Sequence, residues 1–283
     1  MLSVLITLAL VAVVPQYSYW LALLIGLGFT HYALSFYYAR SRIRELGTSS
    51  NHLIPLVGLA GLFALFYLLE FPLEVYFGLH HAFNEAYLKR GNQESKGNTE
   101  IAAQRCLLHL AVYFCILRGD AHLTQIPQWL TWGFALFAIF VYGRQVQTLA
   151  REKGAAIAWS QHSIELGLIA VLALSLLFKI TFFQIVFYHF ILWTLLPLPM
   201  MKQKGDGALQ QYLMLTAAGL LLYFGVLIVF APNQFSAVLV LMLSQFYLWS
   251  YIHITASMAL STAHPRWIVN LFARQAPAAL SPK

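Results

Sequence analysis

Long runs of apolar residues, separated by short polar stretches, follow one another along almost the whole chain. The runs cover residues 2–14, 17–39, 52–69, 72–88, 101–117, 126–143, 160–178, 182–198, 208–230 and 235–263. Several of them approach the roughly 20 residues that an α-helix needs to cross a bilayer. Prolines lie mostly near the ends of the runs, where they end helices without kinking them. The pattern predicts an all-α fold, a polytopic transmembrane helical bundle of about ten membrane segments.

The polar stretches between the apolar runs are too short to form a separate soluble domain. The longest cover residues 89–100 and 144–160. We therefore expect a single transmembrane helical domain over residues 1–268 and a short cytoplasmic tail over residues 269–283. The first run lacks the basic residues that begin a secretory signal peptide, so we expect it to remain in the protein as a short first helix.

The composition agrees with a membrane environment. Of the 283 residues, 60% are hydrophobic and 10% are charged, and the mean hydropathy is +0.70. Soluble domains carry about 25% charged residues, so this chain has too few polar groups to cover a surface in water. We expect an integral, multi-pass membrane protein whose outer surface contacts membrane lipids.

The net charge of +7 is explained by how the basic residues are distributed between loops. If the N-terminus is cytoplasmic, all of the 17 Lys and Arg residues except Arg118 and Lys179 fall on the cytoplasmic side, which is 15 against 2. Cytoplasmic loops of membrane proteins carry such an excess of positive charge. The bias predicts that both termini are cytoplasmic, in what we expect to be a bacterial inner membrane. Nucleic acid is not needed as a partner to explain the charge.

Histidines inside the predicted spans are the main candidates for chemistry. They are His31, His80, His81, His109, His189 and His253, whereas His52, His122 and His264 fall in loops or at span ends, where we expect them to be dispensable. Ionisable groups at membrane depth usually face the bundle interior and indicate function. A shared metal ion would satisfy several neutral imidazoles at once, and imidazole commonly binds iron, copper and zinc. The alternative is that each imidazole forms a hydrogen bond to a neighbouring helix.

Two glutamates lie at helical spacing from a histidine. Glu85 follows His81 by four residues, and Glu165 follows His162 by three. Each pair can therefore share one face of a helix. Such pairs supply iron ligands in helical bundles. One alternative is that the carboxylates orient imidazole rings without binding the metal. Another is that Glu165 pairs with Arg151 or Lys153 at the membrane boundary.

Three short motifs around these histidines resemble those of a known family in their order and spacing. The motifs are Gly28–Ala33 (Gly-Phe-Thr-His-Tyr-Ala), His80 with Glu85 five residues later, and Phe187–His189 (Phe-Tyr-His). They resemble motifs of the bacterial β-carotene-cleaving dioxygenases, the Brp/Blh group of integral membrane proteins. The resemblance implies one iron held by histidines in an apolar bundle. The chain departs from the family where Trp193 replaces a second histidine of the closing motif, and where a proline and a glycine beside the first histidine are absent.

The sequence thus predicts a membrane-embedded, O2-dependent non-haem iron oxygenase resembling the dioxygenases. The expected metal ligands are His31, His80 or His81, His189 and His253, with Glu85 and Glu165 as the candidate catalytic carboxylates. The expected cofactor is Fe(II), and the expected partners are O2 and a lipophilic substrate that is carotenoid- or lipid-like. Two alternatives stay open. One is a redox protein that binds haem b, and the other is a transporter or non-catalytic membrane subunit whose histidines relay protons or join helices by hydrogen bonds.

Overall fold

The structure is a computed structural model that describes most of the chain. It covers residues 6–7, 17–48, 53–69, 72–87, 96–119, 126–152, 154, 156–157, 159–230 and 235–260. Over these ranges the chain forms helices joined by turns and contains no β-strand. The predicted all-α fold is therefore confirmed for the residues that are described. Most of the predicted first run and the whole predicted tail lie outside them.

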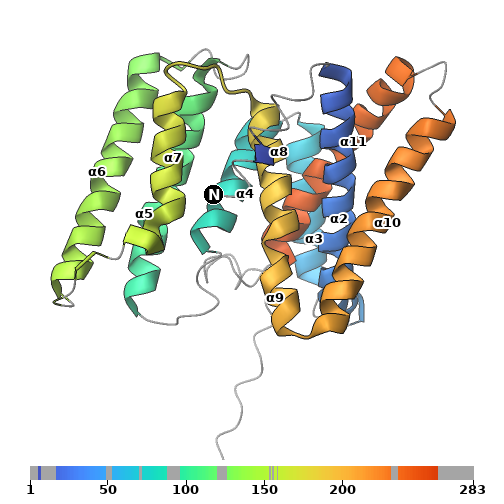
Figure 1. Cartoon of the computed structure of the whole chain (residues 1–283), viewed down its shortest axis with the longest axis horizontal. Coiled ribbons are helices and arrows are strands. Elements are labelled where there is room, and N and C mark those ends of the chain that lie inside the picture. Colours follow the sequence, from blue (N-terminus) through green and yellow to red (C-terminus); the bar gives the residue numbers. More distant parts are fainter. Residues whose placement is uncertain are drawn as a thin grey trace, which may run out of the picture.

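The described residues form a series of helices along the chain. They are α2 (Tyr17–Thr48), α3 (Leu53–Leu68), α4 (Leu73–Tyr87), α5 (Lys96–Ile116), α6 (Gln128–Glu152), α7 (Ser163–Leu174), α8 (Phe182–Leu195), α9 (Pro197–Gln203), α10 (Asp206–Phe230) and α11 (Phe235–Leu260), with short 3₁₀ turns at Leu117–Gly119 and Trp159–His162. Figure 1 shows α5, α6 and α7 on one side of the bundle and α2, α8, α10 and α11 on the other, with α4 between the two groups.

Each group of helices has a hydrophobic core of its own. The larger core joins α2, α4, α8, α10 and α11 and includes the buried rings of Phe187 and Phe246. The second core joins α5, α6 and α7 around residues such as Leu108, Ala138 and Leu172. The buried histidines described below lie in and beside the larger core.

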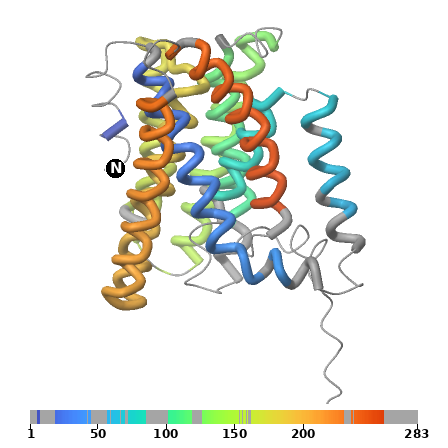
Figure 2. The backbone as a smooth tube through the Cα atoms, turned by 90° about the vertical axis from the view of Figure 1, so that its right-hand side faces the viewer, coloured from blue at the N-terminus to red at the C-terminus, as the bar shows by residue number. Residues whose placement is uncertain are grey.

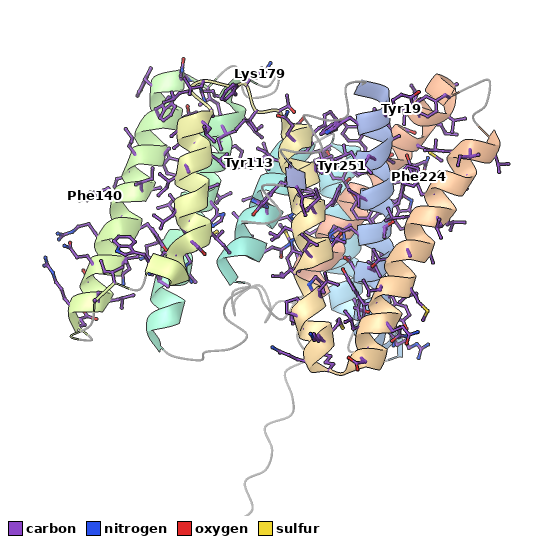
Figure 3. All side chains as sticks on the ribbon, in the orientation of Figure 1. Tyr19, Tyr113, Phe140, Lys179, Phe224 and Tyr251 are labelled. Carbon is purple, nitrogen blue, oxygen red and sulfur yellow. The ribbon has the colours of Figure 1, made fainter. Side chains whose placement is uncertain are left out.

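Helix α4 connects the two groups of helices through a close contact with α5. Gly78 of α4 has no side chain, and a Cβ atom there would lie 2.5 Å from the ring of Tyr113 on α5. The Tyr113 hydroxyl donates a hydrogen bond of 2.7 Å to the backbone carbonyl of Glu74. Figure 3 shows Tyr113 in the interior, between the two groups. The glycine lets the two backbones approach closely, as small residues do in membrane bundles.

Four helices of the described part are long and apolar enough to cross a membrane. They contain the segments Tyr19–Ser41, Phe182–Gln203, Asp206–Val229 and Ala237–Met258. The ten membrane segments expected from the sequence are not supported. One reason is helix length, because the run at residues 160–178 begins in a 3₁₀ turn and ends in turns. The helix α7 that remains has 12 residues and is about 18 Å long, which is shorter than the bilayer core of about 30 Å.

Large apolar side chains cover the outer faces of the bundle. Phe140 on α6 is 63% exposed, and Leu221 and Ile228 on α10 are 73% and 75% exposed. Figure 3 shows Phe140 pointing away from the bundle. Soluble monomers rarely expose apolar surface of this extent, so these faces are explained by contact with lipid. Together with the four long apolar helices they indicate a membrane protein.

Exposed basic residues gather at one end of the bundle, called the basic end below. They are Arg40 and Arg44 on α2, Arg144 and Arg151 on α6, and Lys202 and Lys204 at the turn between α9 and α10, while Arg118 and Lys179 lie at the opposite end. Figure 2 shows the C-terminal part of α2 reaching this end, apart from the α9–α10 turn. Arg105, which the sequence prediction counts among the cytoplasmic basic residues, is buried in α5.

Substitution of Gly28 by alanine tests the packing of α2 in the larger core. A Cβ atom at Gly28 would collide with the ring of Phe246 and lie 3.0 Å from Phe190. Overpacking of this kind costs about 1–3 kcal/mol, so Gly28→Ala should lower the midpoint of thermal unfolding in detergent. Gly61→Ala is the matched control, because a Cβ atom there meets nothing within 4 Å. Equal midpoints for the two variants would contradict this packing.

Candidate functional site

Five histidines that are far apart in sequence meet in the interior of the larger core. They are His31 on α2, His80 and His81 on α4, His189 on α8 and His253 on α11. His80 and His189 are 1% exposed, and His31, the most exposed of the five, is 8% exposed. His109 on α5 lies beside the group, with its ring centroid 6.1 Å from that of His81. The structure therefore brings together all the histidines that the sequence named as candidate ligands.

Four of the rings form a closed cycle, called the histidine ring below. The centroid of the His31 ring lies 4.7 Å from that of His253, and His253 lies 5.3 Å from His80. The cycle closes through His189, which is 5.4 Å from His80 and 5.5 Å from His31. The Nε2 atoms of His31 and His253 are 3.2 Å apart. Each of the four residues comes from a different helix, so the histidine ring joins α2, α4, α8 and α11.

His81 occupies a different position from its neighbour His80. Consecutive residues of an α-helix point about 100° apart, and His81 lies outside the histidine ring. Its Nδ1 is 3.4 Å from Nδ1 of His189. Its ring stacks on that of Phe77, at an interplanar angle of 10°. Of the adjacent histidines in the segment Gly78–Tyr87, His80 therefore belongs to the histidine ring and His81 does not, although both contact His189.

The start of α8 is fixed by a capping box that determines where His189 lies. The backbone N–H of Thr181 donates to the side-chain oxygen of Gln184 at 2.9 Å, and the N–H of Gln184 donates to the Thr181 hydroxyl at 3.4 Å. Reciprocal bonds of this kind satisfy two of the free N–H groups at a helix start. His189 follows about two turns later. The local sequence therefore sets both the first residue of α8 and the direction of His189.

Two tyrosines hold α11 in place on either side of His253. Tyr32 on α2 bonds the Ser250 hydroxyl at 2.7 Å, and Tyr76 on α4 bonds the Thr255 hydroxyl at 2.9 Å. Ser250 and Thr255 each donate to a carbonyl of their own helix, so the tyrosines are the donors in these bonds. The sequence prediction did not include Tyr32 and Tyr76. Their spacing, one residue after His31 and four before His80, is the signal that could have identified them.

Asn84 and Glu85 follow His80 on α4, and the structure describes the side chain of Asn84 but not that of Glu85. The side-chain amide of Asn84 is buried and lies 3.0 Å from Nε2 of His80, one helical turn away. This amide is well placed to orient the His80 ring, a role that the sequence analysis did not assign to it. The side chain of Glu85 is not among those described, so its predicted role as a ligand or catalytic carboxylate lies outside the described part of the structure.

A cavity of about 10 Å³ adjoins the histidine ring. His80, His189 and His253 line one side of it, and Tyr32 and Ser250 add hydroxyl groups. The other walls are apolar and consist of Leu73, Phe77, Phe182, Val186, Phe190, Phe246 and Ile254. A volume of this size holds about one water-sized molecule. It is too small for the long lipophilic molecule that the sequence led us to expect.

The spacing of the histidine ring fits a single metal ion. A metal bonded to imidazole nitrogens at about 2.1 Å lies roughly 3.2 Å from each ring centre, so neighbouring ligand rings should be about 4.5–5.3 Å apart. The observed spacings of 4.7–5.5 Å lie close to this range. Among the described residues, however, no group of three or more His, Cys, Asp or Glu side chains is arranged to hold a metal ion. Binding would therefore require some of the imidazoles to turn so that their nitrogens face one point.

Glu165 lies in a second polar cluster, away from the histidine ring. Its carboxylate is 3.0 Å from Nε of Arg105 on α5, and the residue is 1% exposed. The sequence had suggested Arg151 or Lys153 as partners, but within the described residues the ion pair is made with Arg105. In this arrangement the carboxylate neutralises a buried guanidinium, and no described contact joins it to the histidine ring.

Tyr142 and His162 extend this second cluster. The Tyr142 hydroxyl on α6 lies 2.5 Å from Nδ1 of His162 and also contacts the Arg105–Glu165 pair. The cluster therefore joins α5, α6 and α7 through polar groups inside the second core. His162, the histidine that precedes Glu165 by three residues, therefore pairs with Tyr142 in the described structure.

Comparison with known proteins adds no relative from which the site can be interpreted. No family, no curated protein and no solved structure matches the chain. The chemistry of the site must therefore be inferred from the side chains and their geometry.

The Arg105–Glu165 pair makes a prediction about stability. Removing one partner of a buried ion pair leaves an uncompensated charge and costs about 3–5 kcal/mol. Glu165→Leu should therefore lower the unfolding midpoint strongly. The double variant Arg105→Met with Glu165→Leu should recover most of the loss, because neither charge remains. Thermal unfolding of the three proteins in one detergent measures this, and a double variant no more stable than Glu165→Leu would contradict the pairing.

Proposed function

We propose that the protein is a membrane-embedded, non-haem iron enzyme that uses O2 to oxidise a lipophilic substrate. The observation that carries the proposal is the histidine ring, four buried imidazoles from four helices at the spacing of metal ligands. A buried imidazole needs a partner, and one ion would serve all four. The family resemblance agrees, because His31, His80 and His189 belong to the three motifs that resemble the β-carotene-cleaving dioxygenases.

In this proposal the four imidazoles hold Fe(II), and the bound metal supplies the chemistry of O2 activation. The set consists of neutral nitrogen donors, which suit iron. Asn84 orients His80, and the tyrosine bonds on α11 hold His253 in place. The small cavity beside the histidines is of a size for O2, and most of its lining residues are apolar.

The substrate we propose is carotenoid- or lipid-like and reaches the cavity from the membrane. The cavity of about 10 Å³ is smaller than such a molecule, so side chains must move aside when the substrate binds. Leu73 and Phe182 line the cavity and are the first residues of α4 and α8. Both helices start at the end opposite the basic end (Figure 1). The start of these two helices is therefore the proposed point of access.

The geometry favours this proposal over binding of haem b. Two axial imidazoles on either side of a haem iron have nitrogens roughly 4 Å apart, twice a metal–imidazole bond, and need room for the porphyrin between them. The Nε2 atoms of His31 and His253 are 3.2 Å apart, and the adjoining cavity is far smaller than a haem.

A metal-free network is the second candidate. The His31–His253 and His81–His189 nitrogen pairs, at 3.2 and 3.4 Å, are within reach of hydrogen bonds. They would suit a transporter or a non-catalytic subunit.

We also propose an orientation in the membrane. The exposed basic residues at one end of the bundle support a cytoplasmic location for that end, with Lys179 and Arg118 on the other side. Both termini would then be cytoplasmic, as the loop charges predict. A bacterial inner membrane is the location that the family resemblance implies.

The metal is tested on the full chain purified in mild detergent. We expect about one iron per chain, measured by metal analysis, and no haem absorption. Alanine at His31, His80, His189 or His253 should weaken iron binding more than about tenfold. His162→Asn is the control inside the membrane domain, since His162 belongs to the second cluster. His52, His122 and His264 lie outside the described residues, and their alanine variants should also keep iron.

Three results would overturn the iron proposal. Wild-type protein with neither iron nor haem would favour the metal-free network, and a strong haem absorption band would favour the haem alternative. Loss of iron in His264→Ala would place the metal elsewhere in the chain.

The orientation is tested with single cysteines at opposite ends of the bundle. Gln203→Cys lies at the basic end and Phe178→Cys at the other, and both positions are exposed. The native Cys106 and Cys115 are buried, so they should react slowly. In intact cells a membrane-impermeant maleimide should label Phe178→Cys, and Gln203→Cys should be labelled only after the cells are opened. The reverse pattern would contradict the orientation.

A further inference from the structure

We infer that His81 is a positioning residue for the metal centre, which fixes the tautomer and direction of His189 without binding the metal itself. The inference rests on the proposed function. It also decides between the two adjacent histidines, which the sequence left open.

His80 and His81 differ in what they face. His80 lies in the histidine ring, 5.4 Å from His189 and 5.3 Å from His253 by ring centroids, and it lines the cavity. The ring of His81 contacts only His189 among the four members of the histidine ring in the described contacts, and His81 is not a lining residue of the cavity. The geometry therefore favours His80 as the ligand and places His81 outside the histidine ring, in contact with His189.

The contact between His81 and His189 has the form of an orienting hydrogen bond. The two Nδ1 atoms are 3.4 Å apart. The nitrogens of an imidazole point in roughly opposite directions, so a His189 ring whose Nδ1 faces His81 turns its Nε2 away from His81. If Nδ1–H of His189 donates to Nδ1 of His81, the lone pair of His189 is on Nε2. Histidine ligands commonly donate their second N–H in this way, and the partner sets which nitrogen binds metal.

His81 is itself held firmly enough to act in this way. Its ring stacks on Phe77, with centroids 5.9 Å apart, and meets Tyr113 at 6.3 Å and Tyr188 at 6.3 Å. His81 is 4% exposed, so water does not compete for its Nδ1. Phe77 also lies 5.1 Å from His189 by ring centroids, and it therefore braces both members of the pair.

Two substitutions of His81 distinguish its hydrogen bond to His189 from the packing of its ring against Phe77. His81→Phe keeps an aromatic ring against Phe77 and removes the acceptor, whereas His81→Asn places an amide oxygen near the former Nδ1 position and removes the ring. We measure Fe(II) affinity by competition with a chelator on the full chain. Loss of an orienting partner typically weakens metal binding 10–100-fold, so the dissociation constant should rise about 10–100-fold in His81→Phe. His81→Asn should restore most of the affinity.

Pulsed EPR on protein loaded with Cu(II) supplies a readout that packing alone would not change. The number of bound imidazoles should be the same in wild type and both variants. The signal of one remote imidazole nitrogen, assigned to Nδ1 of His189, should change in His81→Phe and stay near wild type in His81→Asn. If His81→Phe does not fold, His81→Gln replaces it, because its amide reaches beyond the Nδ1 position.

Three other outcomes would contradict the inference, and each would have a different explanation. Wild-type affinity in His81→Phe would show that His81 orients nothing. Loss of one bound imidazole in both variants would make His81 a ligand. A wild-type protein that binds neither metal would remove the proposed function together with this inference.

Discussion

The structure depends on the cost of burying imidazoles in an apolar core. A buried polar group without a partner costs about 1–3 kcal/mol, and His31, His80, His81, His189 and His253 are all buried among apolar residues. They can be satisfied by one another, by neighbours such as Asn84, by a buried water, or by a shared ion. This constraint explains why helices far apart in sequence meet at one point. It also explains why α11 is joined to α2 and α4 by tyrosine hydrogen bonds on both sides of His253.

Much of the fold and part of the site could be predicted because each depends on local patterns. Long apolar runs indicate helices, and histidines inside such runs usually face the interior, which led to His31, His80 or His81, His189 and His253 without a structure. The ten membrane segments were not supported, because apolar runs do not show where a helix unwinds, as on both sides of α7. The Arg105–Glu165 pair was missed because its two residues lie on different helices and only packing brings them together.

The small volume of the cavity changes what the site requires of a substrate. The sequence led us to expect a carotenoid- or lipid-like substrate, but the described side chains leave about 10 Å³ beside the histidines. Close packing of aromatic residues such as Phe190 and Phe246 against Gly28 accounts for the small volume. A site of this kind admits O2 readily and a lipid only after side chains move. Substrate binding and cavity opening are therefore coupled in the function we propose.

The central claim is that four imidazoles from four helices bind one iron. X-ray absorption at the iron edge, measured on the full chain in lipid nanodiscs, tests it most directly. Four imidazoles bound to one iron would give a shell of nitrogen or oxygen atoms at about 2.1 Å from the iron. Scattering from the outer ring atoms would show that the shell includes roughly four imidazoles. Scattering from a porphyrin, a shell with one imidazole or none, or protein that retains no iron would contradict it.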